Sequence, residues 1–149
     1  MSENGIFTNA TEYLSDFGLY KDEAADPDIL NPLVLAFIGD SVFDLYIRTM
    51  LVVSEKGNVN KLHRAATEYV RSGAQARIAK DVVEMLNEKE KDILRRGRNT
   101  HSGYVPKNAI VSEYRYATGF EALVGYLYLK GNMERLIEIL KFSTYGKSE

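Results

Sequence analysis

Apolar residues recur at three- and four-residue intervals along most of this chain, and the alternation typical of β-strands is absent. The pattern predicts an all-α protein, a helical bundle with helices over residues 32–53, 61–71, 74–86, 89–97, 110–130 and 133–142. Residues 1–29 carry scattered apolar positions and are predicted to form an N-terminal arm or short helix, with a partly disordered tail as the open alternative. Residues 30–149 are predicted to form one domain, which is long enough to bury a core.

Polar residues and glycines mark the expected ends of these helices. Asn31 is placed to cap the first long helix, and Pro32 follows where its missing N–H costs nothing. Residues 58–60 form a plausible cap region for the next helix. Gly97 and Gly131 are expected to close the helices that they follow.

The stretch from Leu33 to Arg48, LVLAFIGDSVFDLYIR, is the apolar centre of the sequence. Its expected core positions are Leu33, Phe37, Val42 and Leu45. Gly39 and Asp40 interrupt this pattern in the middle of the predicted helix. A glycine inside a helix costs about 1 kcal/mol relative to alanine, so Gly39 indicates either a close backbone approach or a functional constraint.

Two acidic residues stand in segments that should be buried. Asp40 lies in the first long helix, and Glu121 interrupts the apolar and aromatic stripe of the helix over 110–130. If the two met unpaired, desolvation and mutual repulsion would drive them toward protonation. A divalent cation removes that conflict, and Mg²⁺ is typically held by one or two carboxylates together with waters and phosphate oxygens. We therefore predict that Asp40 and Glu121 bind Mg²⁺, with Mn²⁺ as a substitute, and catalyse phosphodiester hydrolysis; Asp44 is a secondary candidate.

The composition excludes several other kinds of site. The chain has no cysteine, so disulfides and Cys-ligated zinc or iron–sulfur sites are excluded. His63 and His101 are the only histidines, so few imidazole side chains are present to ligate zinc or to act as the base of a His-based triad. The apolar runs are too short to span a bilayer and the N-terminus lacks a secretory signal, so we expect a cytoplasmic protein without a membrane partner.

The net charge of −2 hides a strong asymmetry along the chain. Residues 1–60 carry three basic and ten acidic groups, whereas residues 61–115 carry twelve basic and seven acidic groups. Binding responds to the field at the contact surface, so the middle of the chain indicates a polyanionic partner.

The densest positive cluster is RRGRN, at the start of the polar loop over residues 98–108. Three arginines around a glycine exceed what is needed to complement the end of a helix, and we expect contact with backbone phosphates. The expected phosphate-binding residues are Arg95, Arg96, Arg98, Asn99 and Lys107. Arg71, Arg77 and Lys80 are interpreted instead as solvated residues on helix surfaces.

Two segments about eighty residues apart resemble the motifs of a known family. LAFIGDSVFDLYIR resembles the ribonuclease III signature, whose core reads roughly LEFLGDAVLxLxI, and TGFEALVGYLYL resembles the second acidic motif, DxFEALxGAxYL. The resemblance covers roughly residues 30–140. The segments RSGAQARIAK, LRRGRNTHSG and VPKN…YRYATGFEAL are similar to the Mini-ribonuclease III branch, which lacks the double-stranded-RNA-binding domain.

This resemblance implies a ribonuclease III-like fold and a homodimeric, Mg²⁺-dependent, double-strand-specific endoribonuclease. Such an enzyme leaves 5′-phosphomonoesters and matures the ends of large-subunit (23S) ribosomal RNA precursors. The family aspartate and glutamate map to Asp40 and Glu121.

Two further acidic positions of the family do not carry over. They are occupied by Ala36 and Thr118, which puts the number of metal ions in question. Thr118 is a secondary candidate that could orient a water, and a structural salt bridge is the favoured role for Asp44. The alternative function is a catalytically inactive ribonuclease III-like domain that binds structured RNA.

Overall fold

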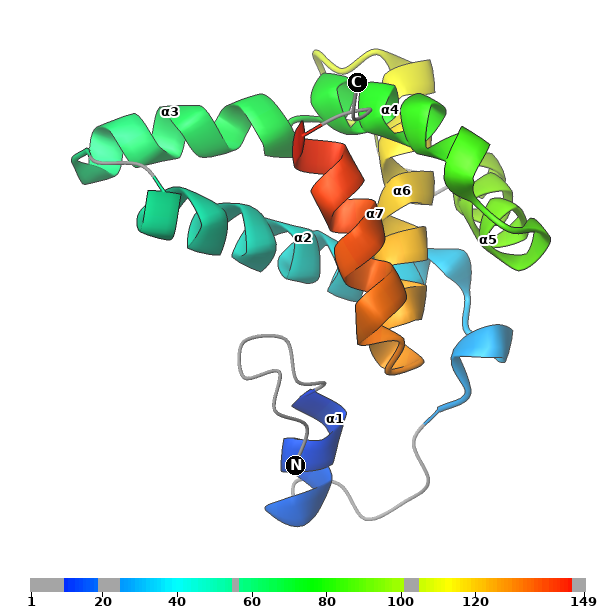
Figure 1. Cartoon of the computed structure of the whole chain (residues 1–149). Helices are drawn as coiled ribbons and strands as arrows, with labels where there is room; N and C mark the ends of the chain where they lie inside the picture. The colour runs from blue at the N-terminus through cyan, green and yellow to red at the C-terminus, as the bar shows by residue number, and fades with distance from the viewer. Residues whose placement is uncertain (1–9, 19–24, 55–56, 101–104, 146–149) are drawn as a thin grey trace.

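The computed structural model describes residues 10–18, 25–54, 57–100 and 105–145, and over these residues it contains helices and no strand (Figure 1). The all-α prediction is therefore confirmed. In chain order the elements are α1 (Ala10–Asp16), the 3₁₀ helix η1 (Pro27–Ile29), α2 (Pro32–Ser54), α3 (Val59–Val70), α4 (Ser72–Val82), the 3₁₀ helix η2 (Val83–Met85), α5 (Glu88–Asn99), α6 (Val111–Leu129) and α7 (Met133–Tyr145). Residues 1–9 and 19–24 of the predicted arm, and 101–104 of the polar loop, lie outside the described residues.

The helix caps predicted at Asn31 and in residues 58–60 are present, and Asn87 forms a further cap that was not predicted. The side chain of Asn58 accepts a hydrogen bond from the N–H of Lys61 at 3.0 Å. The side chain of Asn31 accepts a hydrogen bond from the N–H of Leu33 at 2.8 Å. Asn87 and Glu90 form a reciprocal capping box, in which each side chain accepts from the other residue's N–H at 2.9 Å. Gly131 has φ +74°, the left-handed conformation expected of a glycine that follows a helix.

The expectation that Gly97 ends its helix is wrong, because α5 continues to Asn99. Gly97 instead lies where α5 crosses α6. A Cβ atom at Gly97 would stand 2.8 Å from the Cα of Gly119, so a larger residue would force the two helices apart. The glycine is explained by helix packing and not by helix termination.

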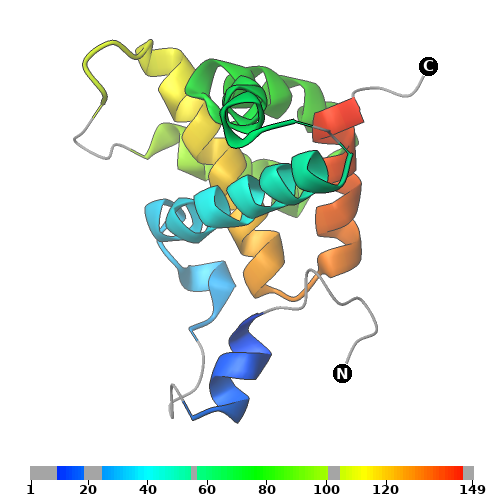
Figure 2. The same cartoon turned by 90° about the vertical axis from the view of Figure 1, so that its left-hand side faces the viewer.

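Helix α6 is the centre of the fold, and α2, α4 and α5 pack around it (Figures 1 and 2). Helix α7 covers a further part of α6. The core is apolar and includes Phe43 of α2 and Phe120 of α6, whose rings meet edge to face at a centroid distance of 5.1 Å. The pairing of α2 with α6 brings the two acidic motifs to one place.

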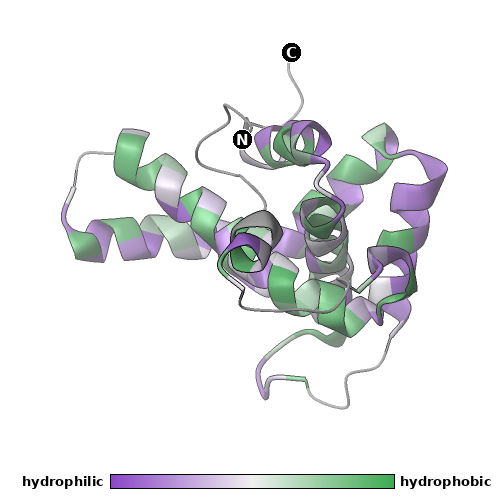
Figure 3. Cartoon of the chain, turned by 90° about the horizontal axis from the view of Figure 1, so that it is seen from below, coloured by the Kyte–Doolittle hydropathy of each residue, from purple (hydrophilic) through white to green (hydrophobic). Residues whose placement is uncertain are grey.

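The expectation that Phe37 and Leu45 face the core is wrong, since they are 81% and 55% exposed. Helix α2 is apolar on two sides, and the side that carries Val42 and Phe43 is the one that packs into the core. The exposed side, which we call the α2 apolar stripe, comprises Val34, Phe37, Leu45 and Val52. Figure 3 shows hydrophobic residues along the projection that α2 and α3 form.

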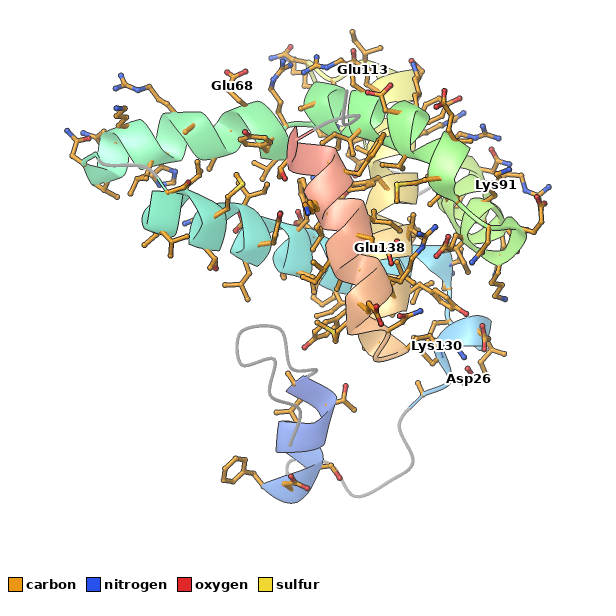
Figure 4. All side chains as sticks on the ribbon, in the orientation of Figure 1. Asp26, Glu68, Lys91, Glu113, Lys130 and Glu138 are labelled. Atoms are coloured by element: carbon orange, nitrogen blue, oxygen red, sulfur yellow. The ribbon has the colours of Figure 1, made fainter. Side chains whose placement is uncertain are left out.

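Ion pairs attach the outer segments to this core. Asp28 of η1 accepts hydrogen bonds from the Tyr126 hydroxyl at 2.6 Å and from Lys130 at 2.5 Å, and these partners hold the pKa of Asp28 far below its usual range. Figure 4 shows Lys130 beside η1 at the end of α6. Arg135 of α7 pairs at 2.8 Å with Glu90, which is buried. None of the described helices combines the length and apolar character needed to cross a membrane.

Candidate active site

The candidate site is built on a backbone contact between α2 and α6. A Cβ atom at Gly39 would lie 1.8 Å from the carbonyl oxygen of Glu121, and one at Gly125 would lie 2.0 Å from the carbonyl oxygen of Leu35. Neither position has room for a side chain, so the close backbone approach predicted for Gly39 is confirmed. Because Asp40 directly follows Gly39, the crossing brings its carboxyl group against that of Glu121.

The carboxyl groups of Asp40 and Glu121 interact directly. Burial raises the pKa of Glu121 to about 9, and a hydrogen bond to Asp40 and the charge of Asp40 contribute in the same direction. Glu121 is half-buried, whereas Asp40 is exposed at the edge of the α2 surface that packs on α6. The expectation that Asp40 is buried is therefore wrong, although the two acids do converge.

No lysine, arginine or histidine in the described parts of the chain forms an ion pair with either carboxyl group. The raised pKa of Glu121 means that protonation of its carboxyl relieves the repulsion between the two acids in the metal-free protein. Two hard carboxylate oxygens without a cationic neighbour fit Mg²⁺, for which one or two protein carboxylates suffice. Within the described ranges, no cluster of three or more acidic, histidine or cysteine side chains is placed to hold a metal.

The secondary candidates have partners on their own helices. Asp44 pairs with Arg48 one turn further along α2, at 3.0 Å, which is the salt bridge favoured for it from the sequence. The hydroxyl of Thr118 donates to the carbonyl oxygen of Tyr114 at 2.9 Å. Ala36 is buried and contributes no polar group.

The predicted phosphate-binding residues lie at the C-terminal end of α5 and just before α6. Arg95 pairs with Asp92 on the same helix, and Lys107 is exposed. The Arg98 guanidinium donates to the side-chain oxygen of Asn99 at 3.1 Å. The structure thus brings part of this set together at the end of α5.

Two residues beside Arg98 were not among the predicted phosphate-binding residues: Tyr116 was not singled out, and Lys80 was interpreted as a solvated residue on a helix surface. Tyr116 of α6 accepts a hydrogen bond from Arg98 at 3.4 Å and has Lys80 of α4 over its ring. These residues are far apart in the chain, and no spacing rule links a tyrosine on one helix to cations on two others. The charge of the middle third of the sequence and the RRGRN cluster indicated a basic surface here, but neither pointed to Tyr116.

Comparison with known proteins identifies the class to which this helical domain belongs. The family model described as Ribonuclease III domain matches residues 33–132, which include both α2 and α6. The chain therefore belongs to the ribonuclease III family, whose members are endoribonucleases.

The similar curated proteins specify the branch. The chain is 56% identical to Mini-ribonuclease 3 of Thermoanaerobacter sp. (strain X514), over 76% of this chain and 80% of that protein. It is 45% identical to Mini-ribonuclease 3 of Streptococcus pneumoniae, over 78% of this chain and 93% of that protein. A crystal structure of a protein from Fusobacterium nucleatum matches with a TM-score of 0.73 and 29% identity, over 83% of this chain and 98% of that one. The predicted resemblance to Mini-ribonuclease III is confirmed.

The raised pKa of Glu121 predicts a pH-dependent stability in the metal-free protein. In the unfolded chain this carboxyl titrates near 4.5, and in the folded chain near 9. The contribution of this pKa shift to the free energy of unfolding is fully present below pH 4.5 and is lost as the pH rises toward 9. The free energy of unfolding therefore falls by at most about 1.4 kcal/mol per pH unit in this interval. Glu121→Gln cannot ionise, so in EDTA we expect it to gain stability over the wild type as the pH increases.

Chemical denaturation between pH 5 and pH 9 measures this change in stability, because that interval covers most of the range between the unfolded and folded pKa values of Glu121. Glu134→Gln, an exposed position on α7, is the matched control and should follow the wild type. Parallel curves for the wild type and Glu121→Gln would show that folding does not raise the pKa of Glu121.

Proposed function

We propose that this protein is a Mg²⁺-dependent, double-strand-specific endoribonuclease that matures the ends of 23S ribosomal RNA precursors in the cytoplasm. The single observation that carries the proposal is the contact between Asp40 and Glu121, held by the glycine crossing of α2 and α6. Membership of the ribonuclease III family and the names of the relatives support the reaction type.

Asp40 and Glu121 would hold Mg²⁺, or Mn²⁺ in its place. When bound, such an ion supplies an activated water and neutralises charge at the scissile phosphate. The carboxyl of Glu121 carries a proton at neutral pH and must release it before both acids can act as ligands. Arg96, Arg98 and Lys107 would bind the RNA backbone, which suits duplex RNA because it is read mainly through its shape, 2′-hydroxyls and phosphates.

The α2 apolar stripe supports a homodimer. A helix that is apolar on both sides is normally covered on both sides, and only one side of α2 packs within the described chain. Phe37 and Asp40 are less than one turn apart, so a twofold axis at this stripe would place the two candidate sites near one interface. Each site would then cut one strand of the duplex.

The alternative is a catalytically inactive domain that binds structured RNA. The observation that favours it is the small donor set, because Ala36 and Thr118 replace two family acids and only two carboxylates converge among the described residues. The retention of Asp40 and Glu121 in direct contact favours the catalytic function.

The test is incubation of the protein with a duplex made of the paired ends of a 23S precursor, with Mg²⁺, with Mn²⁺ or with EDTA, followed by mapping of the product ends. We expect cleavage of both strands in the presence of either ion, with 5′-phosphate products. Binding of the duplex without cleavage in any metal would favour the alternative. The corresponding DNA duplex is the control for RNA specificity, and we expect it to remain intact.

A further inference from the structure

The ring of Tyr116 holds cations that come from two other helices. The Lys80 ammonium of α4 lies 4.8 Å from the ring centroid, and the Arg98 guanidinium of α5 lies 5.4 Å from it. Arg98 also donates a hydrogen bond to the Tyr116 hydroxyl at 3.4 Å. Three helices thus place two positive charges around one half-buried aromatic side chain.

This arrangement differs from that of the cations held by carboxylates. Arg48 and Arg95 pair with aspartates, and Arg135 pairs with glutamates, so their charges are largely compensated. In the portions of the chain that the structure describes, neither Lys80 nor Arg98 has such an ion pair. A neutral ring fixes the position of a cation without cancelling its charge, which leaves both charges available to an anion.

A hollow of about 470 Å³ adjoins this group. It is lined by Arg98, Asn99, Val111, Ser112, Arg115 and Tyr116. The side chains of Asn99 and Ser112 can hydrogen-bond to hydroxyls, and the two arginines attract phosphate. This mixture of groups suits a sugar–phosphate backbone better than an apolar ligand.

We propose that Lys80 binds a backbone phosphate of the RNA duplex together with Arg98, and that Tyr116 is the positioning residue for both cations. The proposal rests on the proposed function and adds two residues to its substrate-binding surface. The long side chains of lysine and arginine lose rotamer freedom when they grip a ligand, and stacking on Tyr116 removes part of that loss in advance. The cations already occupy the ring, so Tyr116 acts through them and not by stacking on a base.

The test measures the binding of a labelled RNA duplex by fluorescence anisotropy in EDTA, which prevents cleavage, between about 50 and 200 mM salt. We expect Lys80→Gln to weaken binding about 5- to 10-fold near 0.1 M salt and to reduce the salt slope by about one. Tyr116→Leu leaves the net charge unchanged, yet it should weaken binding at least as much, since both cations lose their fixed positions. Tyr116→Phe keeps the ring and should bind within about twofold of the wild type.

Lys91→Gln is the matched control for charge. Lys91 is exposed on α5, where Figure 4 shows it on the outer side of the bundle, and it pairs with Glu88 at 3.7 Å. The Lys91→Gln variant should therefore bind the duplex with the affinity of the wild type.

Three outcomes would overturn the proposal. In the first, Lys80→Gln keeps wild-type affinity and salt slope. In the second, Tyr116→Leu binds no more weakly than Tyr116→Phe, whether or not its melting temperature falls. In the third, Lys91→Gln loses as much affinity as Lys80→Gln, which would show that the loss of affinity depends only on the total charge of the protein.

Should Tyr116→Leu fail to fold, the comparison of Lys80→Gln with Lys91→Gln decides. A wild-type protein that neither binds nor cleaves duplex RNA would contradict the proposed function itself, whereas a binding, cleaving wild type with unaffected variants contradicts only the role of Lys80 and Tyr116.

Discussion

Glu121→Gln and Asp40→Asn should each abolish cleavage of duplex RNA while leaving its binding intact. Each substitution removes one of the two carboxylates that converge at the crossing of α2 and α6, and it keeps the size of the side chain. Loss of a metal-binding carboxylate removes several kcal/mol of transition-state stabilisation, which corresponds to a fall in rate of roughly 10³-fold or more. Single-turnover cleavage with excess enzyme measures this loss apart from any change in affinity.

The controls separate catalysis from folding. Asp44 lies on α2, as Asp40 does. Asp44→Asn breaks only the ion pair with Arg48, so this variant should keep most of the activity. Anisotropy in EDTA should show that both active-site variants bind the duplex as the wild type does, because neither carboxyl belongs to the basic surface. Wild-type cleavage by Asp40→Asn would contradict the assignment of this pair as the catalytic centre.

The sequence was sufficient to predict the helices, because their periodicity and caps are local. The convergence of Asp40 and Glu121 was also predictable, because each acid interrupts an apolar helix and Gly39 signals a close approach. The same reasoning from local sequence gave the wrong prediction that Gly97 ends its helix, whereas the glycine allows α5 to pack closely against α6. A helical pattern shows that a glycine is unusual, and only the tertiary structure shows whether it ends a helix or permits a contact.

The orientation of α2 could not be predicted for a related reason. Phe37 and Leu45 have the same helical spacing as true core residues, and the helix is apolar on both sides. Which side faces α6 is decided by Gly39, whose missing side chain allows the backbones to touch. The group around Tyr116 was beyond prediction because it joins residues from three helices with no shared motif.

Phe37→Glu should convert the homodimer proposed at the α2 apolar stripe to a monomer. Phe37 is 81% exposed on the α2 apolar stripe, so the substitution should leave the folded chain intact. An aromatic hot spot in an interface contributes about 2 kcal/mol or more, so if Phe37 anchors the proposed interface its loss should weaken dimerisation at least about 30-fold, and the charge of the new glutamate adds to this. Sedimentation equilibrium over a range of protein concentrations measures the change.

Phe17→Glu is the matched control, because Phe17 is 78% exposed and lies outside α2. The Phe17→Glu variant should sediment like the wild type.

The monomeric Phe37→Glu variant retains its own Asp40 and Glu121, so its remaining activity should appear as single-strand nicks instead of paired cuts. A Phe37→Glu protein that stays dimeric would place the interface elsewhere, and a monomer that cuts both strands at the wild-type rate would contradict the model of two sites across a twofold axis. The exposed stripe and Asp40 occupy neighbouring positions on α2, so dimerisation and two-strand cleavage are expected to fail together.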